Sequence, residues 1–184
     1  MPQERLSEIP GYGATAKGLH WLIAAIILLQ FGLALSMASV CAGNETDLLI
    51  NLHFAFGVLV VPLVLLRLAW RLTHPVPLAM DNVPLWQERL AESTHWLIYV
   101  LLLISPFLGW IAANARGFGV SFFGLFALPT LLASDRALGG LLGTIHQWTS
   151  YALLGIVGLH VLAALYHHFL LRDETLRRML PRLG

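Results

Sequence analysis

The chain has 184 residues, of which 58% are hydrophobic and only 11% are charged, and its mean hydropathy is +0.75. An average soluble domain carries roughly 25% charged residues, so the composition excludes an ordinary soluble protein and predicts an integral membrane protein. The formal net charge of +1 gives no support for binding nucleic acid.

Four apolar runs predict four membrane-spanning helices, because about 20 helical residues cross the roughly 30 Å hydrocarbon core of a bilayer. The runs cover residues 19–40, 48–72, 96–113 and 138–171. Residues 42–47 predict a polar turn, the prolines of 73–77 a helix stop, and residues 81–93 a polar connector. We therefore expect an all-α fold, a transmembrane four-helix bundle that forms a single domain over residues 1–184.

The segment from Phe118 to Pro129 is apolar but rich in glycine and aromatic residues, and we interpret it as an interfacial loop rather than a fifth span. If the amino terminus is cytoplasmic, only Arg116 and Arg136 of the eleven lysines and arginines lie outside. The others are Arg5, Lys17, Arg67, Arg71, Arg89, Arg172, Arg177, Arg178 and Arg182. This bias predicts that both termini are cytoplasmic.

Four histidines in these runs fall into two pairs by depth. His146 and His160 of the fourth run are 14 residues apart, which corresponds to about 21 Å along a helix and a return to within roughly 40° of the same face. We expect His53, which opens the second run, to face His146 near the outer side. We expect His20, which opens the first run, to face His160 nearer the cytoplasm.

An ionisable side chain inside a bilayer is costly and suggests a function. Two imidazoles can clamp a haem iron between helices, so the two pairs predict two haems with His20, His53, His146 and His160 as axial ligands. Any one of these histidines alone would more often be a hydrogen-bonded core residue or an interfacial anchor. Zinc fits less well, because a structural zinc site needs four close ligands and no cysteine or carboxylate lies at matching depth.

Three arginines are candidate partners of haem propionates, since the guanidinium fork matches a carboxylate. Arg67 and Arg71 lie one helical turn apart at the cytoplasmic end of the second run, where the positive-inside bias explains them equally well. Arg116 lies on the side with few positive charges, which favours a propionate partner or a landing point for an anion.

Three further histidines, His95, His167 and His168, lie near the expected cytoplasmic face. An imidazole there could hydrogen-bond a quinone carbonyl and exchange protons at neutral pH, which predicts a quinone pocket beside the inner haem. The alternative is that these histidines lie at the interface and extend toward the lipid headgroups.

Several short motifs in this order and spacing resemble the bacterial cytochrome b561 family. They are His20-Trp21-Leu22, Arg67-Leu68-Ala69-Trp70-Arg71 with Pro75 and Pro77, Asn114-Ala115-Arg116-Gly117, Ile145-His146-Gln147, Gly158-Leu159-His160, His167-His168 and the tail from Arg172-Asp173 to Met179-Leu180-Pro181. The resemblance covers nearly the whole chain. It implies a four-helix, multi-pass cytochrome of the bacterial inner membrane with two haem b groups and the same four histidine ligands.

A characterised subgroup of that family oxidises superoxide to dioxygen and passes the electron to ubiquinone. The resemblance thus implies an oxidoreductase whose partners are membrane lipid, a quinone and superoxide or another small electron donor.

The alternative is a haem-bearing membrane anchor that relays electrons between quinone and a peripheral dehydrogenase or reductase subunit. Short outer loops favour the first function, and a third possibility, a histidine-lined metal transporter, predicts no visible absorbance. The sequence identifies no catalytic residue.

Overall fold

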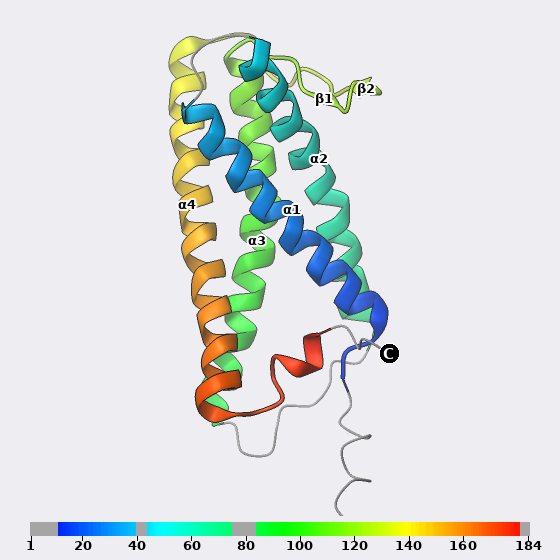
Figure 1. Ribbon diagram of the computed structural model, residues 1–184. Coiled ribbons are helices and arrows are strands. Elements are labelled where there is room, and N and C mark those ends of the chain that lie inside the picture. Colours follow the sequence, from blue (N-terminus) through cyan, green and yellow to red (C-terminus); the bar gives the residue numbers. More distant parts are fainter. Residues whose placement is uncertain (1–10, 40–43, 75–83, 181–184) are drawn as a thin grey trace, which may run out of the picture.

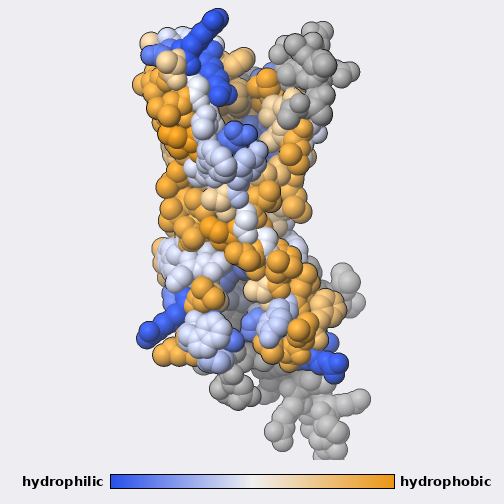
Figure 2. Space-filling model, turned by 90° about the vertical axis from the view of Figure 1, so that its left-hand side faces the viewer, coloured by the Kyte–Doolittle hydropathy of each residue, from blue (hydrophilic) through white to orange (hydrophobic). Residues whose placement is uncertain are grey.

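Four long helices form an elongated bundle in the computed structural model, which describes residues 11–39, 44–74 and 84–180 (Figure 1). They are α1 (Ala14–Ser39), α2 (Asn44–Thr73), α3 (Leu85–Ala115) and α4 (Arg136–Tyr166). Each is long and apolar enough to cross a membrane. The expected all-α bundle of four apolar helices is therefore confirmed, and an apolar band covers the middle of the face seen in Figure 2, between more hydrophilic ends.

Two helices begin earlier than the sequence predicted. Helix α3 starts at Leu85, so the interpretation of residues 81–93 as a connector is wrong for most of its length. Those residues are good helix formers, and Glu88 in the first turn favours a helix start. Helix α2 likewise starts at Asn44, within the expected turn at 42–47. In both helices the polar residues mark where the helix leaves the apolar layer, not where it ends. Residues 75–83, which include Pro75 and Pro77, lie outside the described part of the chain.

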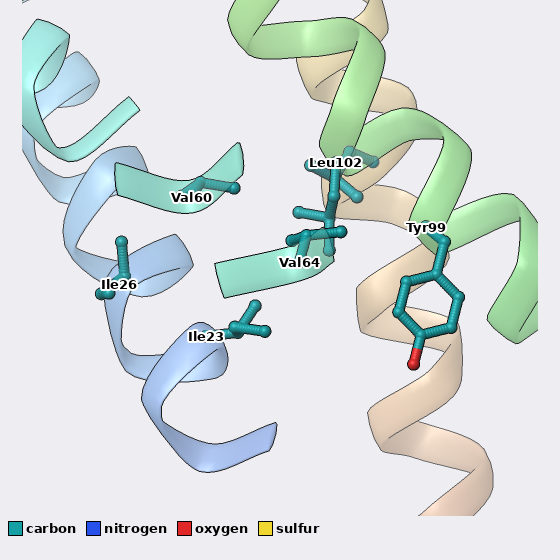
Figure 3. Close-up of a cluster of buried hydrophobic side chains, with 7 residues drawn as sticks. Ile23, Ile26, Val60, Val64, Tyr99 and Leu102 are labelled. Atoms are coloured by element: carbon teal, nitrogen blue, oxygen red, sulfur yellow. The ribbon is translucent and has the colours of Figure 1, made fainter. Parts of the chain in front are cut away.

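The bundle is held together at mid-height by a cluster of buried apolar side chains (Figure 3). Helices α1, α2, α3 and α4 all contribute, through Ile23, Ile26, Val60, Val64, Tyr99, Leu102 and Leu153. Leu153 lies seven residues from His146 and seven from His160 on α4. The cluster therefore fills the interior between the two levels at which the sequence places paired histidines.

The connection between α3 and α4 is a small β-hairpin, which departs from an all-helical fold within the described residues. Strand β1 (Ser121–Phe122) pairs antiparallel with β2 (Phe126–Ala127). The buried Asn114 fixes both ends of this connection, because its Nδ2 donates to the Phe118 carbonyl at 3.1 Å and its Oδ1 accepts from the Leu131 N–H at 2.9 Å. We call this end of the bundle the hairpin end.

The two described ends of the chain meet at the opposite end of the bundle, which we call the termini end (Figure 1). Helix α4 continues into a π-helical turn, η2 (His167–Leu171), and the chain then folds back through a short 3-10 helix, η3 (Arg177–Met179). Lys17 Nζ donates to the Leu180 carbonyl at 2.9 Å, and Trp21 Nε1 donates to the Met179 carbonyl at 2.9 Å. The carboxyl-terminal segment is thereby attached to the start of α1.

Asp173 controls the fold-back. Its burial alone would raise the pKa of this carboxyl, but hydrogen bonds from His167 Nδ1 and from Thr175 outweigh burial and hold the pKa below its ordinary value. A lowered folded pKa means that the stabilisation is complete above the unfolded pKa of roughly 3.9 and is lost as the pH falls through the folded pKa.

We expect Asp173→Asn to loosen the carboxyl-terminal segment at neutral pH and to abolish its acid-induced loosening. The measurement is amide hydrogen exchange of residues 177–180 against pH. Glu174→Gln is the matched control, because the Glu174 side chain pairs with the exposed Arg177 in the described part of the chain, and such surface pairs contribute little. Equal protection in Asp173→Asn and wild type would contradict this role.

Candidate functional site

At the hairpin end, His53 of α2 and His146 of α4 face each other across the bundle. Their ring centroids are 6.3 Å apart, with an angle of 78° between the ring planes. Both rings are largely shielded inside the bundle, and the buried Nδ1 of His53 has no hydrogen-bond partner among the described residues. A buried polar atom without a hydrogen bond is costly and therefore needs an explanation.

The separation of these rings fits a metal held between them. A metal–imidazole nitrogen bond is about 2.0–2.1 Å long, and that nitrogen lies roughly 1.1 Å from the ring centre by aromatic geometry. Two imidazoles on opposite sides of one metal ion therefore have their centroids roughly 6.3 Å apart. The observed spacing thus leaves room for one metal ion between the two rings. Imidazole nitrogen is also a ligand that haem iron accepts.

A cavity of about 780 Å³ opens beside this pair. It lies within the roughly 300–1,000 Å³ range of cofactor and ligand sites. All four helices and the hairpin line it with mainly apolar side chains. The polar groups at its wall besides the two histidines include Gln30, Ser105, Arg116, Ser150 and Tyr151.

The backbone of α3 fixes the orientation of His146. His146 Nδ1 lies 2.9 Å from the Ser105 carbonyl oxygen, and because a carbonyl only accepts, Nδ1 carries the proton and Nε2 keeps its lone pair. The Ser105 hydroxyl lies 3.3 Å from the same nitrogen and 3.1 Å from the Ser150 hydroxyl. A Cβ at Gly109 would lie 3.1 Å from His146 Cε1. Glycine at this position therefore lets the ring lie against α3.

At the termini end, three histidines come together. The ring centroids of His20 (α1) and His160 (α4) are 6.3 Å apart, the same separation as at the hairpin end. His95 of α3 lies closer, with its ring centroid 5.2 Å from that of His160. The structure therefore brings together His20 and His160 as the sequence predicted, and it adds His95 to the same group.

The three candidate arginines have different surroundings. Arg67 donates from Nη1 to the Ala16 carbonyl at 2.7 Å and so holds the start of α1 against α2. The Arg71 guanidinium lies over the rings of Trp96 and Tyr99, 5.5 and 5.9 Å from their centroids. Both arginines thus have contacts within the protein at the termini end.

Arg116 reaches across α4 at the hairpin end. A Cβ at Gly139 would lie 2.7 Å from Arg116 Cγ, and a Cβ at Gly143 would overlap its guanidinium. Two glycines one helical turn apart therefore form a shallow track in which the arginine lies. Because Arg116 also lines the cavity, its positive charge is available to an anionic group bound there.

The three histidines proposed for quinone lie in different environments. His95 belongs to the termini-end group, His167 is hydrogen-bonded to the Asp173 carboxylate, and the His168 ring packs against Phe169 at 4.8 Å between centroids. Of the three, His95 is the one for which the structure gives a direct contact with a paired histidine.

Four apolar helices with histidine pairs facing each other in the interior define the class of membrane-bound b-type cytochromes. The chain belongs to the prokaryotic cytochrome b561 family, because the model of that family, described as "Prokaryotic cytochrome b561", matches residues 11–182. The predicted family is thereby confirmed. Membership of this family implies haem b, and the residues around the hairpin-end cavity fit it: two imidazole rings whose centroid separation leaves room for a metal ion, and a guanidinium at the wall.

Similar proteins extend over nearly the same length. The chain is 30% identical to "Cytochrome b561 homolog 2" of Escherichia coli over 172 residues, which cover 93% of this chain and 92% of that protein. It is 28% identical to "Probable superoxide oxidase CybB" of Yersinia pestis, over 93% of this chain and 96% of that protein. It is also 28% identical to "Cytochrome b562" of Cereibacter sphaeroides, over 96% of this chain and all of that protein.

Sequence reasoning missed the groups that orient His146. Ser105, Gly109 and Ser150 are small residues in apolar helices, and nothing in their spacing marks them as partners of a histidine on another helix. The glycines at the start of α4, Gly139-Gly140 with Gly143, were a signal of a different contact, the close approach of Arg116.

Proposed function

We propose that this protein is a di-haem membrane cytochrome that moves electrons between the two ends of its bundle. The observation that carries the proposal is the pair of equal 6.3 Å histidine separations, His53–His146 and His20–His160, at opposite ends of the apolar layer. Haem b, when bound by such a pair, supplies a one-electron redox centre. Each pair would hold a haem through its two imidazole side chains, and the bound group would supply electron transfer without binding the donor or the acceptor at its metal.

The side chains between the pairs insulate them. The cluster around Leu153, Val60 and Val64 excludes water from the middle of the bundle, where α4 separates the two histidine levels by about 21 Å. Within each site the protein orients the ligands, as the Ser105 carbonyl does for His146. The protein thus orients the ligands, excludes water and places charged side chains near the site, while the redox chemistry is that of the cofactor.

Superoxide is the donor that we propose at the hairpin end. Support comes from the similar protein named probable superoxide oxidase and from the Arg116 guanidinium at the cavity wall, which favours approach of an anion. Each superoxide loses one electron and leaves as dioxygen. Two such electrons, with two protons, convert one quinone to a quinol.

Ubiquinone is the acceptor that we propose at the termini end. His95 supports this assignment, because its ring lies beside His160 and an imidazole can hydrogen-bond a quinone carbonyl and pass on a proton. Placing the termini end in the cytoplasm of a bacterial inner membrane agrees with the arginine and lysine bias of the sequence. Superoxide oxidation would then occur on the outer side.

The test is stopped-flow reduction of the purified oxidised protein by superoxide, followed in the visible spectrum. Rapid reduction that superoxide dismutase abolishes is the expected result. Absence of reduction would overturn the superoxide assignment, and reduction only after addition of a dehydrogenase subunit would identify a relay that serves a peripheral partner.

Arg116→Gln is expected to slow reduction by superoxide on the order of tenfold, because loss of a positive charge at a cavity entrance weakens electrostatic steering. The loss should shrink at high salt, since screening removes steering in the wild type as well. Arg136→Gln is the matched control, because Arg136 begins α4 at the same end of the bundle but does not line the cavity. Equal rates for both variants would contradict the role of Arg116.

A further inference from the structure

We propose that the hairpin between α3 and α4 is an anchor that inserts into the headgroup and acyl boundary of the lipid leaflet at its end of the bundle. Its strands project sideways from the bundle, past α2, rather than onward along the bundle axis (Figure 1). No charged residue occurs between Arg116 and Asp135. The hairpin exposes Leu125 by 77% and Phe126 by 56%. Exposed apolar surface of this kind marks an interaction site.

The hairpin tip is fixed at a defined depth by its contact with α2. Phe123 packs edge-on against Phe56, with 5.1 Å between ring centroids. The apolar span of α2 is Leu48–Thr73, 26 residues, or about 39 Å of helix, which extends roughly 4–5 Å beyond a 30 Å hydrocarbon core at each end. Phe56 lies eight residues, or about 12 Å, into that span, so the tip that contacts it lies in the outer part of the leaflet and not at the bilayer centre. Interfacial elements insert to about 5–10 Å.

The backbone of the tip shows that this position is built into the fold. Phe123 and Gly124 have φ values of 48° and 73°, and together they form a tight left-handed turn between the strands. A bulky residue rarely adopts such a conformation, and its strain must be compensated by contacts. Here the Phe123 ring contacts Phe56 and Phe122. These contacts hold the turn against α2 and direct the following Leu125 outward.

Lipid fits the hairpin better than a second copy of the chain or the hydrocarbon centre. The exposed side chains of the hairpin continue the apolar outer surface of α2, which contacts lipid in a membrane. Aromatic residues are also enriched at membrane interfaces. The hairpin also has open strand edges, which hydrocarbon cannot satisfy but headgroups and their water can. A ribbon of two residues per strand offers too little surface for a stable protein interface.

The anchor also forms part of a wall of the hairpin-end cavity. Phe118, Val120 and Leu128 line that cavity, and Val120 is 2% exposed. The hairpin therefore has one set of side chains toward the proposed cofactor site and another toward lipid. Insertion of Leu125 and Phe126 into the lipid leaflet would hold this wall of the cavity in place.

The experiment places a nitroxide spin label on the hairpin of the full-length, haem-loaded protein in nanodiscs of phosphatidylethanolamine and phosphatidylglycerol. Cys41, the one cysteine of the chain, is first replaced by serine. Labels at Leu125→Cys and, separately, Phe126→Cys are compared with a lipid-facing control, Leu159→Cys at 67% exposure, and with a control at an exposed charged position at the start of α4, Arg136→Cys. Power saturation then reports collision with dissolved oxygen and with a polar nickel chelate.

Lipid insertion predicts that the hairpin labels collide with oxygen as the Leu159 label does. It also predicts that nickel collisions are at least about tenfold rarer than for the Arg136 label, because excluding a polar reagent tenfold requires only roughly 1.4 kcal/mol. Nickel access equal to that of Arg136 would overturn the proposal. Shielding from both reagents would overturn it in favour of a second copy of the chain. These readouts do not depend on electron transfer, so the anchor can fail while the proposed function holds.

Discussion

His146→Ala is expected to lower the haem content from two groups per chain to one. Its imidazole is one of the two donors that we propose for the haem at the hairpin end, 6.3 Å from the ring of His53, and a haem left with one of these ligands in an apolar cavity would lose most of its hold on the protein. His53→Ala should lose the same haem. The measurement is the pyridine haemochrome of purified protein per polypeptide.

His74→Ala is the matched control for this result. His74 is exposed and stacks on Trp70 of its own helix with 3.7 Å between ring centroids, so its removal should leave both haems in place. Retention of two haems in His146→Ala would contradict the ligand assignment at the hairpin end. Added imidazole should restore the missing spectrum in His146→Ala if the cavity keeps its shape, which separates loss of a ligand from a failure to fold.

His160→Ala and His20→Ala are each expected to lose the other haem, whereas His95→Ala should retain it. The reason is distance. His20 and His160 have the 6.3 Å separation that an intervening metal requires, while the 5.2 Å between His95 and His160 is too short for a metal held between two rings. His95→Ala should instead slow oxidation of the reduced protein by quinone.

The haem contents of these three variants identify which histidines bind the haem at the termini end, and no activity measurement is needed. Loss of haem in His95→Ala with retention in His20→Ala would show that His95 is the ligand and would remove it as a candidate for quinone. The double variant His146→Ala with His160→Ala should be colourless. Residual colour in that variant would mean that the remaining histidines bind haem in another arrangement.

Much of the fold was predictable because hydrocarbon permits few solutions. A chain this apolar must satisfy its backbone inside each spanning segment, so four apolar runs predict four helices. The helix ends were less predictable. The segment at Leu85–Ser93 is polar, and polarity locates the edge of the membrane but not the end of a helix, which here extends into the polar region.

The histidine pairs followed from periodicity and depth alone. His146 and His160 share one face of α4, and the alternating direction of successive helices sets which partner reaches each level. The third histidine at the termini end could not be assigned in the same way. His95 lies on α3 at a depth close to that of His20, and only the rotation of α3 about its axis decides that its ring lies beside His160.

The sequence by itself therefore determined that the chain belongs in a lipid bilayer, how many long helices it has and at what depth its histidines lie. Each of these depends on composition and on distances along one helix. Apart from the two histidine pairs, the contacts between neighbouring helices were decided only by the tertiary structure. The Ser105 carbonyl beside His146, the track of Gly139 and Gly143 under Arg116, and the contact of Phe123 with Phe56 depend on the rotation and close packing of neighbouring helices. Those quantities are set jointly by many side chains and do not appear in any one segment.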